Sequence, residues 1–249
     1  MKWFFKIVMF IQIFCLSKYS FAQMSKLDFG YATYEVIYKH FWEAKDSNHI
    51  YVKQDKTILD YDKLLSNYTS ILQFNNICSK YETSSAGSPR DFAGNAIANL
   101  YDTYYYCLPK SIKLTERVHK GYLEYISDNL PLQWEISTDT IVLNGLSCIK
   151  ATGFRYFPGF EKASVYTAWF TPDIPVPFGP IDINGLPGLI LKFKLFSSVV
   201  EVVDIKKLTD KKNKLILPMV KETISYDEKI LEAKKKRAEV LKNKTKLKN

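Results

Sequence analysis

Short runs in which apolar and polar side chains alternate fill most of this chain and limit the folds that it can adopt. Alternation with a period of two, as in Tyr34–Lys39, places every second side chain on one face and is typical of strands with one buried face. Comparable runs follow at 69–74, 77–81, 102–108, 111–118, 122–126, 133–136, 147–154, 164–170, 189–196 and 199–205, with a further candidate at 49–53. The spacing predicts a mainly β protein, a single curved or partly closed antiparallel sheet that is half-barrel or barrel-like, rather than alternating β and α units.

Two pairs of residues between these runs favour tight turns. Asn75 and Asn76 separate two runs, and Asn tolerates a positive φ, so the sequence predicts a hairpin there. Asn144–Gly145 predicts a second hairpin. Residues 84–94 lack any period and are interpreted as a loop, whereas 62–67 is compatible with a short helical turn.

The first 22 residues have the features of an export signal. Lys2 and Lys6 precede an apolar stretch, and Ser20 and Ala22 place small residues before a cleavage site at Gln23. A membrane anchor would need about 20 apolar residues, and Lys18 ends the stretch too early. A lipoprotein signal at Cys15 is a further alternative, disfavoured by the bulky residue before that cysteine. We expect a signal peptide over 1–22 and export to the periplasm or cell envelope, or secretion.

The net charge of +9 would suggest a nucleic-acid partner, but the charge is unevenly distributed along the chain. Residues 226–249 hold nine basic and four acidic residues, and the body from 23 to 225 is left with a net charge of only +1. Only four basic residues are arginines, whose forked guanidinium suits phosphate and guanine, so we expect no nucleic-acid partner. Residues 226–249 predict a basic C-terminal helix and tail. Its run Lys234–Arg237 is interpreted as a solvated face or as a peripheral contact with an anionic membrane.

Three cysteines remain after the expected cleavage, namely Cys78, Cys107 and Cys148. Export permits one disulfide and leaves one thiol, and a bond between Cys78 and Cys107 requires those residues to be close neighbours on adjacent strands. The cysteine spacings do not resemble those of a zinc site, and the histidines are scattered along the chain. We therefore expect no metal and no cofactor, and leave the pairing open.

The stretch from 171 to 190 contains five of the ten prolines and three of the ten glycines. Proline removes an amide donor and fixes φ, so this stretch cannot be an interior strand and must cross a surface or wrap an edge. Gly185-Leu186-Pro187-Gly188 predicts a turn in which glycine takes a positive φ. Leu189 then begins a buried strand.

Residues 184–190 read NGLPGLI, which resembles the signature of the GLPGLI family, exported proteins found mainly in Bacteroidota and lacking an established molecular function. The strand 166–172 before the signature, the Gly-x-x-Cys-x-Lys-Ala run at 145–151 and Trp134 also resemble family positions, although Glu135 replaces a usual basic residue. The resemblance implies export and a β-rich fold, and it supplies no catalytic residues. The residues that match its structural signature are Gly179, Pro180, Gly185, Leu186, Pro187, Gly188, Leu189 and Ile190.

The signature has two interpretations. In the first, prolines and glycines shape a crossing while Trp169, Leu186 and their neighbours pack into the core. In the second, the loop forms the lip of an apolar pocket in which Trp169, Phe178 and Leu186 meet a ligand or partner, and Tyr104 and Tyr106 line the hollow.

We expect a noncatalytic binding or accessory module whose apolar concave sheet face meets a small hydrophobic ligand or an outer-membrane receptor or transporter. One alternative is an exported hydrolase using Asp173 and Asp182, or Asp128 and Glu135, although no familiar catalytic motif is present. Another is a purely structural envelope component. A carrier requires an apolar cavity of roughly several hundred Å³, which a filled core would exclude.

Overall fold

A computed structural model describes residues 33–43, 68–85, 102–108, 112–119, 122–127, 132–156, 163–195, 198–208, 215–220, 222–232 and 234–235. The predicted leader at 1–22 and the predictions for 49–53 and 62–67 lie outside these residues. The described residues form twelve strands, which reproduce the predicted runs and add a short one near the C-terminus. Their bounds are β1 Thr33–Trp42, β2 Tyr68–Phe74, β3 Cys78–Ser85, β4 Thr103–Cys107, β5 Ile112–His119, β6 Tyr122–Ser127, β7 Gln133–Leu143, β8 Leu146–Arg155, β9 Ser164–Thr171, β10 Leu189–Leu195, β11 Ser198–Leu208 and β12 Ile224–Ser225.

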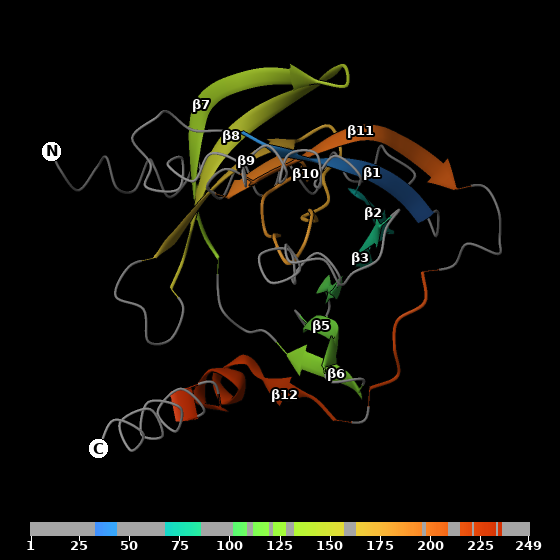
Figure 1. The fold of residues 1–249 in the computed structure, drawn as a ribbon. Coiled ribbons are helices and arrows are strands. Elements are labelled where there is room, and N and C mark those ends of the chain that lie inside the picture. The colour runs from blue at the N-terminus through green and yellow to red at the C-terminus, as the bar shows by residue number, and fades with distance from the viewer. Residues whose placement is uncertain are drawn as a thin grey trace, which may run out of the picture.

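The strands form one curved sheet in the order β12-β6-β5-β4-β3-β2-β1-β11-β10-β9-β8-β7 (Figure 1). Strands β7 and β12 are its two edges, so the sheet is not closed into a barrel. Most neighbours in the chain pair as antiparallel hairpins, as the short connections require. The parallel pair of β12 with β6 makes the sheet mixed, a feature that the sequence did not predict. The prediction of a mainly β protein built on a curved, incompletely closed sheet is confirmed.

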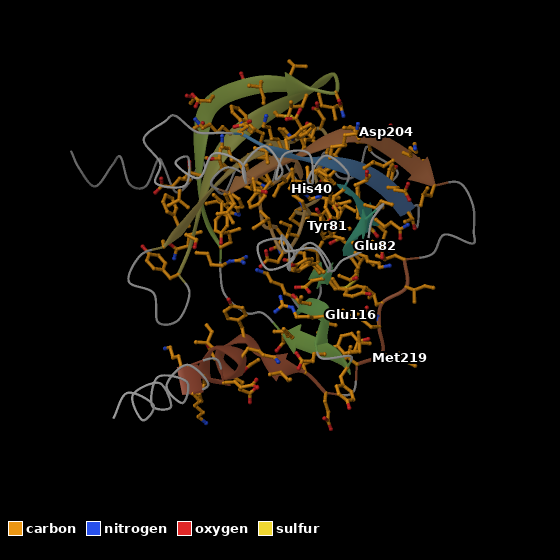
Figure 2. The ribbon with its side chains drawn as sticks, in the orientation of Figure 1. His40, Tyr81, Glu82, Glu116, Asp204 and Met219 are labelled. Atoms are coloured by element: carbon orange, nitrogen blue, oxygen red, sulfur yellow. A yellow bond between two sulfur atoms is a disulfide. The ribbon has the colours of Figure 1, made fainter. Side chains whose placement is uncertain are left out.

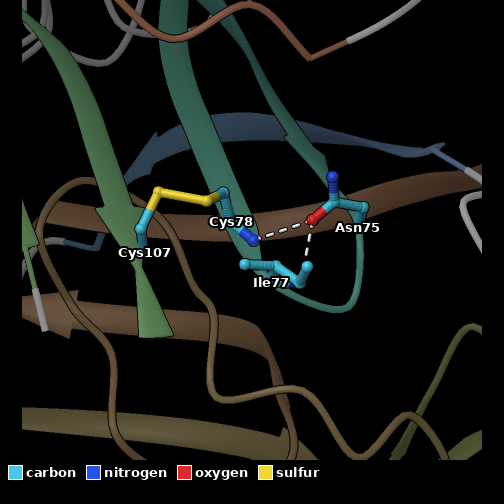
Figure 3. Close-up of a disulfide and its surroundings, with 4 residues drawn as sticks. All are labelled: Asn75, Ile77, Cys78 and Cys107. Carbon is cyan, nitrogen blue, oxygen red and sulfur yellow. Dashed lines mark hydrogen bonds between the residues drawn. A yellow bond between two sulfur atoms is a disulfide. The ribbon is translucent and has the colours of Figure 1, made fainter. Parts of the chain in front are cut away.

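Both predicted hairpin turns are present. Asn144 and Gly145 have φ values of 49° and 77°, the positive pair that a two-residue turn between twisted strands needs. The first turn is one residue longer than predicted, because Ile77 also lies outside the strands. The Asn75 side-chain oxygen accepts hydrogen bonds from the backbone N–H groups of Ile77 and Cys78, both at 2.8 Å (Figure 3). The asparagine thus fixes this turn through its side chain.

Cys78 and Cys107 are bonded to each other in a disulfide. They stand opposite one another on β3 and β4, with Cα atoms 4.2 Å apart (Figure 3). The pairing that the sequence left open is therefore provided by the register of two adjacent strands. Cys148 is a buried free thiol, and burial raises its pKa to about 11.

The two faces of the sheet differ in chemistry because successive side chains of a strand point to opposite sides. On the concave face, β1 contributes Val36 and Tyr38, and β9 contributes Phe170, all buried. On the convex face, Lys192 of β10 pairs with Glu201 of β11 at 2.7 Å. Charged side chains thus cover the outside of a sheet whose inside holds the apolar core.

A short helix follows β12 over residues 226–232, with 234–235 also helical, where the sequence predicts one. Ser225 and Glu228 begin it with a capping box: the Glu228 N–H donates to the Ser225 hydroxyl oxygen, and the Ser225 N–H donates to the Glu228 carboxylate. These hydrogen bonds lower the pKa of Glu228. Lys229 joins the helix to β6 through an ion pair with Glu124 at 2.7 Å. Among the described residues, no helix has the length and apolar character needed to cross a membrane.

Candidate functional site

Residues 172–188, here called the crossing segment, join β9 to β10 and pass across the concave face of the sheet (Figure 1). The Phe178 ring lies 5.9 Å from the ring of Phe74 on β2 and 5.9 Å from that of Tyr106 on β4. In the strand order, β2 and β4 are separated from β10 by β1 and β11, so the segment reaches strands well beyond the two that it joins, which the curvature of the sheet makes possible. The crossing segment lies inside the fold, against the sheet, rather than around an outer edge.

The crossing segment satisfies its own backbone despite its prolines. The N–H of Gly185 donates to the carbonyl of Pro177 at 3.0 Å, and the N–H of Ile190 donates to that of Phe178 at 3.0 Å. The N–H of Leu189 donates to Ile174 at 2.9 Å. Because buried backbone groups are costly when unpaired, these bonds allow an irregular segment to lie in the core.

Two glycines of the signature are required by geometry. Gly185 has a φ of 93°, as predicted for the turn. A Cβ at Gly188 would overlap the backbone carbonyl of Thr171, where β9 ends. The following strand then buries three consecutive residues, Leu189–Leu191, because a bulge between Ile190 and Lys192 inserts one extra residue into β10.

Three contacts tie the crossing segment and its junction with β10 to distant strands. The Tyr38 hydroxyl on β1 donates to the carbonyl of Ile190 at 2.7 Å. The indole N–H of Trp134 on β7 donates to the carbonyl of Asn184 at 3.0 Å. The buried Arg155 on β8 forms an ion pair with Asp182. The segment is thus held from several sides.

The structure brings four of the five predicted binding residues together, but as packed core residues. Phe178 and Leu186 are 0% and 1% exposed, and Tyr104 is also buried. Tyr106 is half-buried and packs edge-on against Phe178. Of the two interpretations of the signature, the placement of these side chains agrees with the packing one.

Trp169 does not join this group. It lies between the buried Ala168 and Phe170 on β9, so its side chain points to the convex face. There the Lys150 ammonium lies 5.8 Å from the centre of the Trp169 ring, a cation–π distance. A ligand held between Trp169 and Phe178 would have to pass through the sheet.

A small space remains between the crossing segment and the strands beside it. It is lined by residues 104–106 and 113–115 of β4 and β5, by Ser79, and by Gly179 and 181–184 of the crossing segment. Its volume is about 10 Å³, enough for one water molecule. That is far below the several hundred Å³ or so that a small-molecule carrier uses.

The carboxylates considered for hydrolysis that lie in the described residues have different surroundings. Asp182 is engaged by Arg155, while Asp173 is exposed beside the end of β9 and Glu135 is exposed on β7. Asp128 lies outside the described residues. Within the described part of the chain, no three His, Cys, Asp or Glu side chains gather as metal ligands would.

The structure contains a buried polar cluster around His40 of β1 that the sequence analysis did not predict. His40, labelled in Figure 2, is 0% exposed. Its Nε2 lies 2.6 Å from the Ser70 hydroxyl, and that hydroxyl lies 2.7 Å from Thr83 Oγ1. Burial lowers the pKa of His40 to about 4. The signal was available, because the alternation of β1 places His40 on the same face as Val36 and Tyr38.

Comparisons with known proteins identify likeness over part of the chain. A family model described as a protein of unknown function (Porph_ging) matches residues 157–192, which include β9, the crossing segment and the start of β10. No curated protein matches the chain.

Among solved structures, one titled "Structure of PNGF-II in P21 space group" is similar with 18% identity and a TM-score of 0.48, covering 78% of this chain and 31% of that chain. This chain therefore spans about a third of the length of that protein. The segment that crosses the concave face is thus also the segment by which this chain is similar to the Porph_ging family.

Proposed function

We propose that this protein is an exported, noncatalytic accessory module of the GLPGLI family that binds a protein partner through the outside of its sheet. The observation that carries the proposal is the filled concave face. Phe178 and Leu186 occupy the place where a small apolar ligand was expected, and about 10 Å³ remains beside them. Of the expected occupants, a protein partner fits this arrangement better than a small ligand.

The disulfide supports the export part of the proposal. Cys78 and Cys107 form a disulfide between neighbouring strands, and such bonds persist mainly in oxidising compartments such as the periplasm. The expected leader over residues 1–22 provides a route to that compartment.

Strand β7 is the surface that we assign to the partner. It spans Gln133–Leu143, and within the described residues its outer edge pairs with no strand. Ile136 and Val142 expose 52% and 73% of their area, although such edges are usually shortened, charged or covered. An extended strand of a partner could add to this edge through backbone hydrogen bonds.

Site-specific photo-cross-linking in native envelopes tests this assignment. A photoreactive residue at Thr140 on β7 should yield one discrete protein adduct, whereas the same residue at the exposed Asp204 on β11 should not. Val142→Lys should weaken the Thr140 adduct, because a charged lysine on an edge strand disfavours the addition of another strand. The matched variant Val203→Lys, at a valine 41% exposed on β11, should leave it intact.

Two results would contradict the proposal. A small apolar molecule that stays bound to the folded chain in native mass spectrometry, at one per chain, would favour the carrier. Absence of any position-dependent adduct would favour the purely structural component.

A further inference from the structure

Residues 215–220, Leu-Ile-Leu-Pro-Met-Val, form an apolar run on the outside of the molecule shortly before β12. The run is neither strand nor helix, and Ile216 and Met219 expose 77% and 99% of their area. Figure 2 shows Met219 at the outer margin of the molecule, beyond the strands β5 and β6. Consecutive aliphatic side chains with this exposure are uncommon on a free surface and indicate a contact with something apolar.

More apolar surface lies at the same edge of the sheet. Tyr122 and Leu123, at the start of β6, are 77% and 54% exposed. Because β12 runs parallel to β6, with Ile224 opposite Ile126, the chain reaches β12 from the end of β6 at which Tyr122 lies. Two segments that are distant in the sequence therefore present apolar side chains at one edge.

Lysines surround the run in the sequence. From 204 to 222 there are six lysines and three acidic residues, a net charge of +3, although the whole body from 23 to 225 carries a net charge of only +1. Lys206 and Lys207, at the end of β11, are exposed, and Lys206 pairs with Asp204 at 3.1 Å. Apolar side chains next to several lysines are the combination that binds the interface of an anionic bilayer, where the lysines meet lipid headgroups.

We infer that residues 215–220 insert into the surface of an anionic lipid membrane, with the neighbouring lysines on the headgroups. A protein occupant is less well matched, because lysine, which flanks the run on both sides in the sequence, is depleted in protein interfaces. This surface lies at the β12 edge, opposite in strand order to β7, so the inference does not depend on the proposed partner strand. It also differs from contact through the basic tail, which the sequence alone suggested.

Sedimentation with lipid vesicles tests the inference. The processed protein, expected to begin at Gln23, is mixed with phosphatidylcholine vesicles with or without about one third phosphatidylglycerol. We expect binding to the anionic vesicles that weakens as salt is raised. Ile216→Ser with Met219→Ser should reduce the partition coefficient by about tenfold or more, since both side chains lose their apolar burial. The wild type and all variants have the same N-terminal region, so any contribution of that region to vesicle binding cancels when their partition coefficients are compared.

Three variants complete the experiment. Val142→Ser, at a valine of similar exposure on β7, should bind like the wild type. Neutralising the lysines at 211, 212 and 214 should weaken binding to anionic vesicles only. Lys234→Gln with Lys235→Gln should retain most of the binding.

The inference is overturned if the wild type does not bind anionic vesicles, or if the tail variant loses binding while the Ile216 and Met219 variant keeps it. It is equally overturned if the apolar variant instead abolishes self-association, which would identify a second copy as the occupant. Because both substituted side chains are exposed, the variant should keep the wild-type unfolding midpoint, and that measurement shows that it is folded.

Discussion

The strands around the crossing segment and the strands near the β12 edge show the same alternation of apolar and polar side chains. Only the first group shares one large apolar cluster. Around the crossing segment, strands β1 to β4 and β8 to β11 bury inner side chains in one apolar cluster. At the other end, no described residue of β5, β6 or β12 belongs to that cluster. Leu114 of β5 and Ile126 of β6 are buried apart from it, and the ion pair between Lys229 and Glu124 joins the C-terminal helix to β6. Alternation defines two faces of a strand, and the large apolar cluster of this sheet forms where the crossing segment covers one of them.

The largest effect that we expect separates these two ends directly. Phe178→Ala should lower the free energy of unfolding by about 3–5 kcal/mol, because it removes a fully buried ring from the crossing segment. Leu123→Ala, at a leucine 54% exposed on β6, should change it by less than about 0.5 kcal/mol. Urea unfolding measures both. Equal losses would mean that the crossing segment is not part of the core.

The disulfide lies between these ends, on β3 and β4, and should contribute about 3.5 kcal/mol by restricting the unfolded chain over the 29-residue separation of its cysteines. The double variant Cys78→Ser and Cys107→Ser should lose that amount in urea unfolding. A reductant should destabilise the wild type and leave the double variant unchanged. Equal sensitivity of both proteins to the reductant would contradict this assignment.

His40 makes the core side sensitive to acid. Burial lowers the pKa of His40 to about 4, below the ordinary value near 6.5. Between these two pH values, His40 is protonated in the unfolded chain and neutral in the folded chain. Stability should therefore fall as the pH drops from 6.5 towards 4, by up to about 3 kcal/mol. Unfolding of the wild type and of His40→Gln, compared at each pH, isolates this contribution. If the free energy of unfolding changes with pH by the same amount in both proteins, His40 is not responsible for the loss.

The smallest effect concerns the bond between β7 and the crossing segment. Trp134→Phe removes the N–H that donates to the Asn184 carbonyl, and it replaces the indole, whose six-membered ring lies against Gly153, by a smaller ring. The loss should be about 1 kcal/mol in thermal or urea unfolding. A loss like that expected for Phe178→Ala would mean that ring packing, rather than this hydrogen bond, dominates at Trp134.

Local patterns predicted the strands and turns well, because alternation and turn residues act within a few positions. Asn144 and Gly145 form the predicted turn, and Leu189 begins the predicted buried strand. The sequence analysis grouped Trp169 with Phe178, whereas Phe170 occupies the inner face of β9, so the alternation of that strand places Trp169 on the outer face.

Contacts between distant segments were beyond local patterns. The parallel pairing of β12, the hydrogen bond from Trp134 to Asn184 and the cluster of His40 with Ser70 each join residues from separate elements. Such contacts depend on which strands the folded chain places side by side. The filled concave face depends on them too, because it requires the crossing segment to meet β2 and β4.

Amide hydrogen exchange tests most directly whether the crossing segment is part of the core. The amides of Ile183, Gly185, Leu189 and Ile190 donate to carbonyls within the segment, and we expect those of Gly185, Leu189 and Ile190 to exchange as slowly as the amides of β9. Fast exchange of these amides, with β9 and β10 still protected, would show a mobile lip over an accessible hollow and would contradict the account.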